Sequence, residues 1–247
     1  MLSGNWVYNN VRNSGQVGVT AAYPRSGNGS VEMNTLFGPG GASSKADIEF
    51  LAQPVNLGGN FVAGGSLGLF SNLNLSGLGY DWYRNSTSSN SAVQHPAYRI
   101  LLDADGDLTT TGDRGGLVFE RAYNGGGPVP TDTWVTETIT GSSKVWNFGL
   151  GLGFEYVLPF PFGSGSAYEP ITAWQAFLPN AVVLGFSVGV GSGWGPFQGA
   201  ADNIRFGFGT DSTTYNFELL RGPEIPTPAA FMGGSVLMGM LATRRRK

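Results

Sequence analysis

A β-strand is most clearly predicted by the stretch Val182-Val183-Leu184-Gly185-Phe186-Ser187-Val188, which turn-forming residues enclose. Similar stretches occur at residues 80–84, 99–103, 116–121, 133–139 and 203–208, with earlier ones at 16–23, 30–35 and 47–51. Each is bounded by Gly, Pro, Asn, Asp or Ser, as strands between turns are. The pattern predicts about ten to twelve strands of ordinary length.

The composition agrees with many short elements. The 247 residues include 40 glycines and 14 prolines, and 13% are charged, about half the average for globular proteins. Glycine and proline destabilise helices, so a helical bundle and a coiled coil are excluded. Because 41% of the residues are hydrophobic, the chain can bury a core and is not a disordered polymer.

One short helix is expected at residues 170–177, with Pro170 in its first turn and Pro179 after its end. No linker and no internal repeat divide residues 1–222, so we predict a single domain there. Many antiparallel strands and one helix favour an all-β fold, specifically a jelly-roll-type sandwich.

Charge and residue types exclude several functions. Residues 1–225 contain ten basic and seventeen acidic residues, a net charge of −7, so nucleic acid is not an expected partner. The absence of cysteine excludes disulfides, thiolate zinc sites and cysteine nucleophiles. The only histidine, His95, precedes Pro96 and is predicted to lie in a turn or at a strand entry, not to act as a catalytic base.

The last 25 residues have a different character. Proline-rich residues 223–228 precede an uncharged run, Ala229 to Ala242, and a basic end. As a helix, the uncharged run would span about 21 Å, less than the roughly 30 Å of a bilayer core, so we do not predict a permanent membrane anchor. It also lacks the polar face that a helix of a soluble domain needs. We therefore assign residues 223–247 to a separate segment.

This segment resembles the sorting signal of PEP-CTERM proteins. The resemblance is carried by Ile225, Pro226, Thr227 and Pro228, the apolar run, and Arg244, Arg245, Arg246 and Lys247. Thr227 stands where the family usually has Glu. The resemblance implies that exosortase cleaves the tail at the inner membrane of a Gram-negative-type bacterium. It also implies export to the cell surface or extracellular matrix. Residues 1–6 lack the features of a secretory signal, so we expect translation to start upstream.

The body carries a second resemblance. Residues 26–30, 80–84, 95–99, 103–107, 191–194 and 201–204 resemble the extracellular jelly-roll domains found before PEP-CTERM tails. Those domains are similar to carbohydrate-binding modules. The resemblance implies that the partner is an extracellular polysaccharide.

An acidic loop is a candidate calcium site. Asp103, Asp105 and Asp107 alternate along the chain, and Asp113 follows. Calcium prefers six to eight oxygen ligands, although the glycine and glutamate of an EF-hand are not in place here. The sequence thus predicts a structural calcium site of another kind, and the alternative is a solvated acidic turn. We predict no other cofactor.

Tryptophans are candidates for stacking on sugar rings. Trp82 and Trp134 fall in predicted strands and Trp174 on the apolar face of the helix, so we expect these three to be buried. Gly, Ser and Asn flank Trp146 and Trp194, which favours loop positions. We predict these two as glycan-stacking residues, with core packing as the alternative.

Paired carboxylates would instead indicate a glycosidase. Four glutamates lie in or beside predicted strands, namely Glu49, Glu120, Glu137 and Glu155. Their spacing selects no pair, and Glu120 could equally form an ion pair with Arg99 or Arg121. The leading hypothesis is therefore a non-enzymatic exported protein that binds polysaccharide or contributes to biofilm structure. The alternatives are a secreted glycan hydrolase or lyase on the same scaffold, and a self-associating surface-layer subunit.

Overall fold

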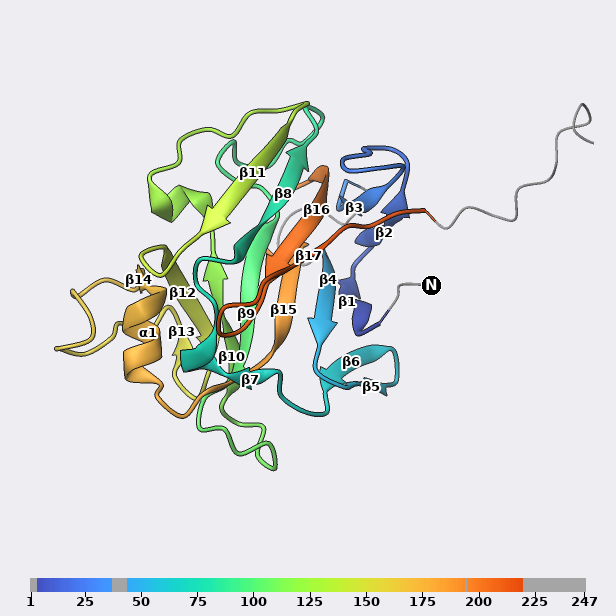
Figure 1. The fold of residues 1–247 in the computed structure, drawn as a ribbon. Coiled ribbons are helices and arrows are strands. Elements are labelled where there is room, and N and C mark those ends of the chain that lie inside the picture. The colour runs from blue at the N-terminus through green and yellow to red at the C-terminus, as the bar shows by residue number, and fades with distance from the viewer. Residues whose placement is uncertain (1–3, 37–43, 194, 220–247) are drawn as a thin grey trace, which may run out of the picture.

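The computed structural model describes residues 4–36, 44–193 and 195–219. This part of the chain is mostly β, with antiparallel sheets and one α-helix, α1 (Ile171–Phe177) (Figure 1). The predictions of an all-β fold and of a helix at this position are both confirmed. The predicted sorting segment, including Ile225 to Pro228 and Arg244 to Lys247, lies outside the described residues.

Two sheets form the body. The larger has the spatial order β1 (Trp6–Arg12), β4 (Lys45–Leu51), β15 (Val182–Val190), β9 (Ala97–Asp103), β10 (Arg114–Phe119), β12 (Lys144–Gly149), β13 (Gly153–Phe154), with β7 (Gly68–Leu69) beside β15 and β14 (Glu169–Pro170) beside β12. The smaller has the order β11 (Trp134–Ile139), β8 (Leu78–Arg84), β16 (Gln198–Phe206), β3 (Ser30–Asn34), β2 (Gln16–Thr20), with β17 (Thr213–Tyr215) beside β16. A separate hairpin joins β5 (Pro54–Leu57) and β6 (Asn60–Ala63).

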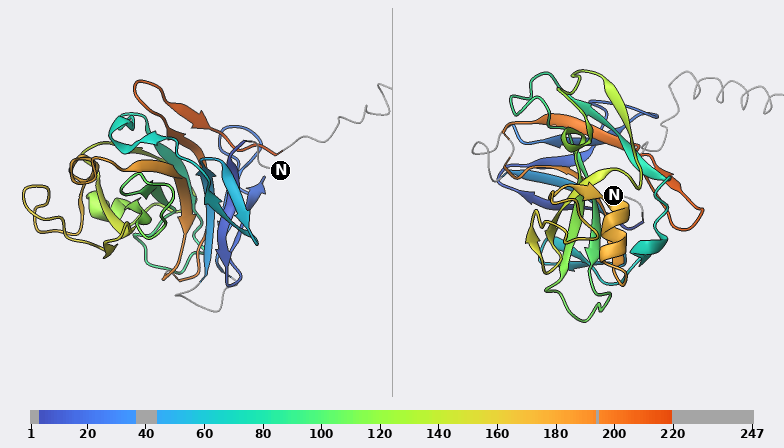
Figure 2. Two further views of the ribbon diagram at one scale, coloured as in Figure 1. Left: turned by 90° about the horizontal axis from the view of Figure 1, so that it is seen from below. Right: turned by 90° about the vertical axis from the view of Figure 1, so that its left-hand side faces the viewer.

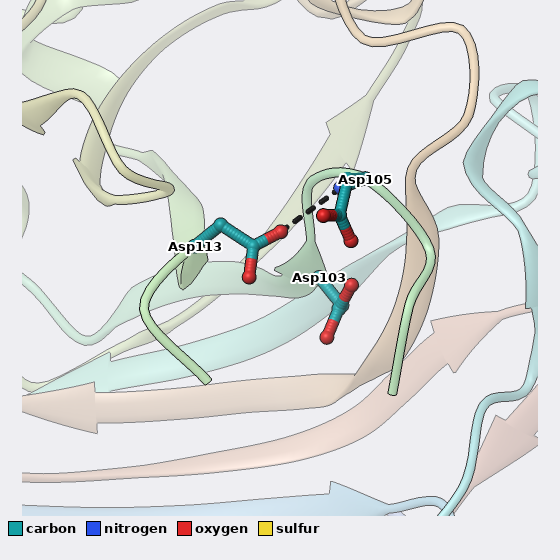
Figure 3. Close-up of side chains that lie close together, drawn as sticks. All are labelled: Asp103, Asp105 and Asp113. Carbon is teal, nitrogen blue, oxygen red and sulfur yellow. Dashed lines mark hydrogen bonds between the residues drawn. The ribbon is translucent and has the colours of Figure 1, made fainter. Parts of the chain in front are cut away.

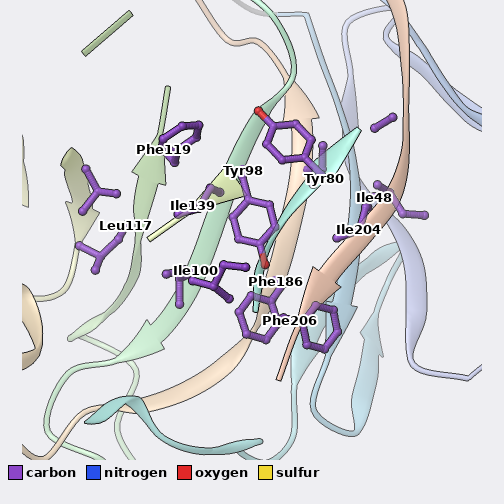
Figure 4. Close-up of a cluster of buried hydrophobic side chains, with 14 of the residues drawn as sticks. Ile48, Tyr80, Tyr98, Ile100, Leu117, Phe119, Ile139, Phe186, Ile204 and Phe206 are labelled. Carbon is purple, nitrogen blue, oxygen red and sulfur yellow. The ribbon is translucent and has the colours of Figure 1, made fainter. Parts of the chain in front are cut away.

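The two sheets pack face to face around one hydrophobic core (Figure 4). Alternation places every second side chain of a strand in this core. Phe186 of β15 stacks on Phe206 of β16 with ring centroids 4.1 Å apart, so the rings join the two sheets. The Tyr98 hydroxyl of β9 donates a hydrogen bond of 3.0 Å to the Arg205 carbonyl of β16. These contacts make the molecule a β-sandwich.

Predicted and observed strands differ in their ends and in their number. Every predicted stretch overlaps a strand, although β16 begins five residues before the predicted start, at Gln198. The described residues form 17 strands, more than predicted, because several have only two to four residues. Among the described strands of five or more residues, β1 and β12 were not predicted. The helix lies at one side of the sandwich beside β14, as Figure 2 also shows, and buries Ile171 and Trp174.

The outer face of the larger sheet carries a row of aligned side chains. The strand register places Glu49, Ser187, Arg99, Val118 and Trp146 side by side across β4, β15, β9, β10 and β12. In the next row, a Cβ on Gly189 would overlap the Asp47 carboxylate. Position 189 of β15 therefore requires glycine, because the Asp47 side chain occupies the space beside its Cα.

The β5–β6 hairpin covers one end of this outer face. Asn9 of β1 donates a hydrogen bond of 2.8 Å to the Phe61 carbonyl and accepts one of 2.9 Å from its N–H. A small apolar cluster that includes Leu51, Ala63 and Leu184 fills the space beneath. The part of the outer face over β9, β10 and β12 is not covered by this hairpin and contains a pocket.

No helix within the described ranges is both long and apolar enough to cross a bilayer.

Candidate functional site

A pocket of about 320 Å³ lies over the outer face of the larger sheet. Its lining changes along the sheet. Lys45 of β4 and Arg99 of β9 line one side, and Trp146 of β12 with Phe154 of β13 lines the other. Further lining residues are Gln94, Ala97, Val118, Glu120, Tyr123, Phe148, Glu155, Gly191 and Ser192. The pocket therefore combines aromatic rings with charged groups of both signs.

Trp146 and Glu120 form one wall. The Trp146 indole Nε1 donates a hydrogen bond of 2.9 Å to Glu120 Oε2, and the ring lies 4.9 Å from that of Phe154. Burial raises the pKa of Glu120, although the Trp146 hydrogen bond and the charge of Arg99 act against this. Trp146 lies in a strand and is half-buried, so its predicted loop position is wrong.

Glu155 adds a second carboxylate to the pocket. It follows β13 with a φ of +49°, and the Tyr168 hydroxyl donates a hydrogen bond of 3.0 Å to its Oε1. The Tyr168 ring stacks on Tyr123 with centroids 4.0 Å apart. The charge of Glu155 contributes to the raised pKa of Glu120, so the two carboxylates interact. Of the four candidate glutamates, the pocket brings together these two.

Both cations of the pocket bind the same carboxylate. Arg99 Nη1 lies 3.0 Å from Asp47 Oδ1, and Lys45 Nζ lies 2.9 Å from Asp47 Oδ2. Arg99 also donates a hydrogen bond of 3.3 Å to Ser187 Oγ. Arg99 is thus paired with Asp47, and the alternative pairing with Glu120 is wrong.

The other two candidate glutamates do not line this pocket. Glu49 is buried and accepts hydrogen bonds of 2.6 and 2.9 Å from the side chains of Asn9 and Asn10, and burial raises its pKa. Glu137 forms an ion pair of 3.2 Å with Arg121. Both glutamates therefore serve contacts that hold neighbouring elements together.

The other predicted tryptophans divide as follows. Trp82 and Trp174 are fully buried, as predicted. Trp134 is only half-buried, because it lies in edge strand β11 of the smaller sheet with the Arg25 guanidinium 5.7 Å from its ring centroid. Trp194 lies outside the described residues.

His95 lies two residues before β9, at the strand entry that was predicted. It is buried, and its ring stacks on Trp82 with centroids 4.6 Å apart. The Arg121 N–H donates a hydrogen bond of 3.3 Å to His95 Nε2. Burial lowers the pKa of His95 to about 3, so the ring is neutral at pH 7 and contributes packing and hydrogen bonds.

The acidic loop follows β9 (Figure 3). Oxygens of Asp103, Asp105 and Asp113 lie within 4.8 Å of one another, and Asp107 is not part of this group. Some of these oxygens already serve the loop. Asp113 Oδ2 accepts hydrogen bonds of 3.1 and 3.0 Å from the N–H groups of Ala104 and Asp105. Asp103 Oδ2 lies 3.3 Å from Arg114 Nε. Since a carboxylate has about four lone-pair positions, the donor set still fits a hard cation.

The pocket is the more complete of the two sites. Aromatic rings can pack against the C–H faces of a sugar, while carboxylates accept hydrogen bonds from hydroxyl groups and Arg99 donates to them. The acidic loop offers only oxygen ligands. Neither a scan against protein-family models nor a search of curated proteins finds a match to this chain.

Proposed function

We propose that this protein binds polysaccharide outside the cell and contributes to the structure of an extracellular matrix or biofilm. The observation that carries the proposal is the pocket on the larger sheet, in which the half-buried Trp146 is bonded to Glu120 and Arg99 lines the opposite side. Ligand sites are typically concave, with apolar walls and a few polar groups that fix orientation. A sugar ring, which has an apolar face and a rim of hydroxyl groups, matches that arrangement.

The strand order supports a jelly-roll assignment for the body. In the smaller sheet, β16 lies between β3 and β8, with β11 beyond β8. In the larger sheet, β15 lies between β4 and β9, with β10 beyond β9. The two consecutive long strands β15 and β16 therefore lie in different sheets, β15 between β4 and β9 and β16 between β3 and β8. Eight strands wound in this way are typical of jelly rolls, which include many lectin domains.

Export is the second part of the proposal. It is supported by the resemblance of residues 223–247 to a PEP-CTERM sorting signal, for which exosortase is the processing partner. The tail would contact the inner membrane only until it is cleaved. The mature protein would then be displayed at the cell surface or released into the matrix.

We expect Trp146→Ala to weaken polysaccharide binding at least about tenfold, because the variant loses the burial of a large apolar ring against the sugar, which contributes about 1.5–3 kcal/mol. Retention of the purified protein during affinity electrophoresis in polysaccharide gels measures the change. The matched control is Trp134→Ala, which removes another half-buried tryptophan, from the smaller sheet. Equal retention of wild type and Trp146→Ala on every gel that slows the wild type would contradict the proposal.

A secreted glycan hydrolase or lyase is the second candidate. The presence of both Glu120 and Glu155 in one pocket favours it, since glycosidases use two carboxylates in different roles. Release of new sugar ends from a polysaccharide distinguishes the two candidates. If the wild type cleaves the polysaccharide and both Glu120→Gln and Glu155→Gln lose this activity, the proposed function is catalysis and not binding alone.

Calcium remains a prediction for the acidic loop. Calcium at about five times its dissociation constant is expected to stabilise the fold by about 1 kcal/mol, which raises the melting temperature by about 2–4 °C. Asp105→Asn should abolish the rise, because it removes a charge while an amide oxygen can still accept the Asp107 N–H. Asp107→Asn is the matched control and should retain the rise, since Asp107 is outside the group. Identical melting curves of the wild type with and without calcium would exclude the site.

A further inference from the structure

A second hollow adjoins the pocket beside Glu120. This smaller hollow, of about 110 Å³, is lined by Ser91, Val93, Gln94, His95, Glu120, Ala122 and Tyr123. Gln94, Glu120 and Tyr123 also line the pocket that contains Trp146. Because three side chains border both spaces, the two hollows adjoin, and we refer to them together as the depression, with Trp146 at one end and Ala122 at the other.

The wall of the smaller hollow is held by a buried cation. Arg84 Nη1 donates hydrogen bonds of 2.6 Å to Asn90 Oδ1 and 2.8 Å to the Gln94 carbonyl. Asn90 Nδ2 in turn donates a bond of 3.0 Å to Gln94 Oε1. These bonds fix the loop between β8 and β9, so the hollow exists before any ligand arrives. A preformed wall lowers the entropic cost of binding.

A partly exposed ring lies where the two hollows meet. Tyr123 belongs to the 3-10 turn η2 (Arg121–Asn124), stacks on Tyr168, and is 37% exposed. An aromatic ring between two hollows suits a ligand that extends from one into the other, with successive sugars near Trp146 and near Tyr123. A single sugar residue would leave the smaller hollow unused.

The charges of the depression bear on the kind of sugar. Lys45 and Arg99 both bind Asp47, so much of their charge is already compensated. Glu120 and Glu155 accept hydrogen bonds from neutral donors, the Trp146 N–H and the Tyr168 O–H. Among the described residues, neither carboxylate has a cation within ion-pair distance, so both would repel the carboxylates of a uronic-acid chain near Trp146, while Arg84 adds a buried positive charge beneath the smaller hollow.

We propose that the ligand is an uncharged oligosaccharide chain that occupies both hollows, with one sugar residue packed on Trp146 and the next passing Tyr123 toward Ala122. This inference rests on the proposed polysaccharide-binding function and adds the class of chain and its path. Affinity should increase with chain length only up to about two or three sugar residues, because the depression comprises two adjoining hollows.

The test is calorimetric titration with oligosaccharides of one to six residues from β-1,4-glucan, β-1,3-glucan and β-1,4-mannan, and with oligogalacturonate. In at least one neutral series, affinity should rise about tenfold from one residue to three and then level off. Ala122→Trp, which fills the smaller hollow, should remove this rise and leave the affinity for the single sugar unchanged. Thr138→Trp, an exposed position of β11, is the control and should keep the rise.

The outcomes separate this inference from the proposed function. Binding that does not depend on chain length, or a rise that persists in Ala122→Trp, would overturn the two-hollow path while leaving polysaccharide binding in place. Tighter binding of oligogalacturonate than of every neutral series would overturn the uncharged class. If no oligosaccharide bound at any length, both the path and the proposed function would fall.

Discussion

Arg84→Ala is expected to lower the free energy of unfolding by about 3–5 kcal/mol, since it leaves several buried acceptors without their donor. Besides its bonds to Asn90 Oδ1 and the Gln94 carbonyl, Nη2 donates bonds of 3.2 and 3.1 Å to the carbonyls of Ser88 and Asn90. Only 3% of the residue is exposed, so water cannot take over these bonds without opening the loop.

Urea denaturation of the two proteins measures this change. Arg84→Lys should recover only part of the loss, because an ammonium group cannot reach acceptors spread around a planar guanidinium. Arg12→Ala is the control. Its side chain is exposed at the end of β1, so its removal should cost about 0.5 kcal/mol or less. A loss in Arg84→Ala as small as that in Arg12→Ala would show that the loop is held by other contacts.

Acidification from pH 7 to pH 5 is expected to remove about 2 kcal/mol of stability through His95 alone. The folded protein holds the pKa of His95 near 3, whereas the unfolded chain has a pKa near 6.5. Between these values the unfolded state binds the additional proton. The contribution is therefore complete above about pH 6.5 and is lost as the pH falls toward 3.

The His95 contribution has to be separated from others of opposite sign. Burial raises the pKa of Asp202 to about 6, so protonation of Asp202 stabilises the fold as the pH falls through that range. Comparing wild type with His95→Gln at pH 7, 6 and 5 isolates the histidine, because Asp202 contributes equally to both. The gap in stability between the two proteins should narrow as the pH falls. A difference in the free energy of unfolding between the two proteins that stayed constant with pH would mean that His95 has the same pKa in the folded and the unfolded state.

Local sequence pattern was sufficient for the strands that alternate cleanly. It failed at β12, where Asn147 occupies an inward position between Trp146 and Phe148. Asn147 is completely buried, donates a bond of 3.1 Å to the Gly153 carbonyl, and accepts one of 2.7 Å from the Tyr156 N–H. A polar side chain that is satisfied by tertiary contacts looks like a loop residue in sequence. The signal that could have revealed the strand is the β-branched and aromatic character of Val145, Trp146 and Phe148 around the single polar residue.

The pocket could be predicted only in part. Trp146, Glu120 and Glu155 were candidates from residue type, but their meeting depends on the pairing of β10 with β12 and on the turn into β13. Arg99, Lys45 and Asp47 come together because β4 and β9 both flank β15. That neighbourhood joins segments far apart in the chain, and no local periodicity encodes it.

The place where the described chain ends has a consequence for orientation. The Leu219 N–H donates a hydrogen bond to Asn28 Oδ1, in the loop before β3 of the smaller sheet, whereas the pocket opens on the larger sheet. A molecule held at a cell boundary through the residues that follow Leu219 would turn its smaller sheet toward the anchor and its binding face toward the surroundings. A molecule oriented in this way would bind a polysaccharide chain of the matrix while it remains attached to the cell.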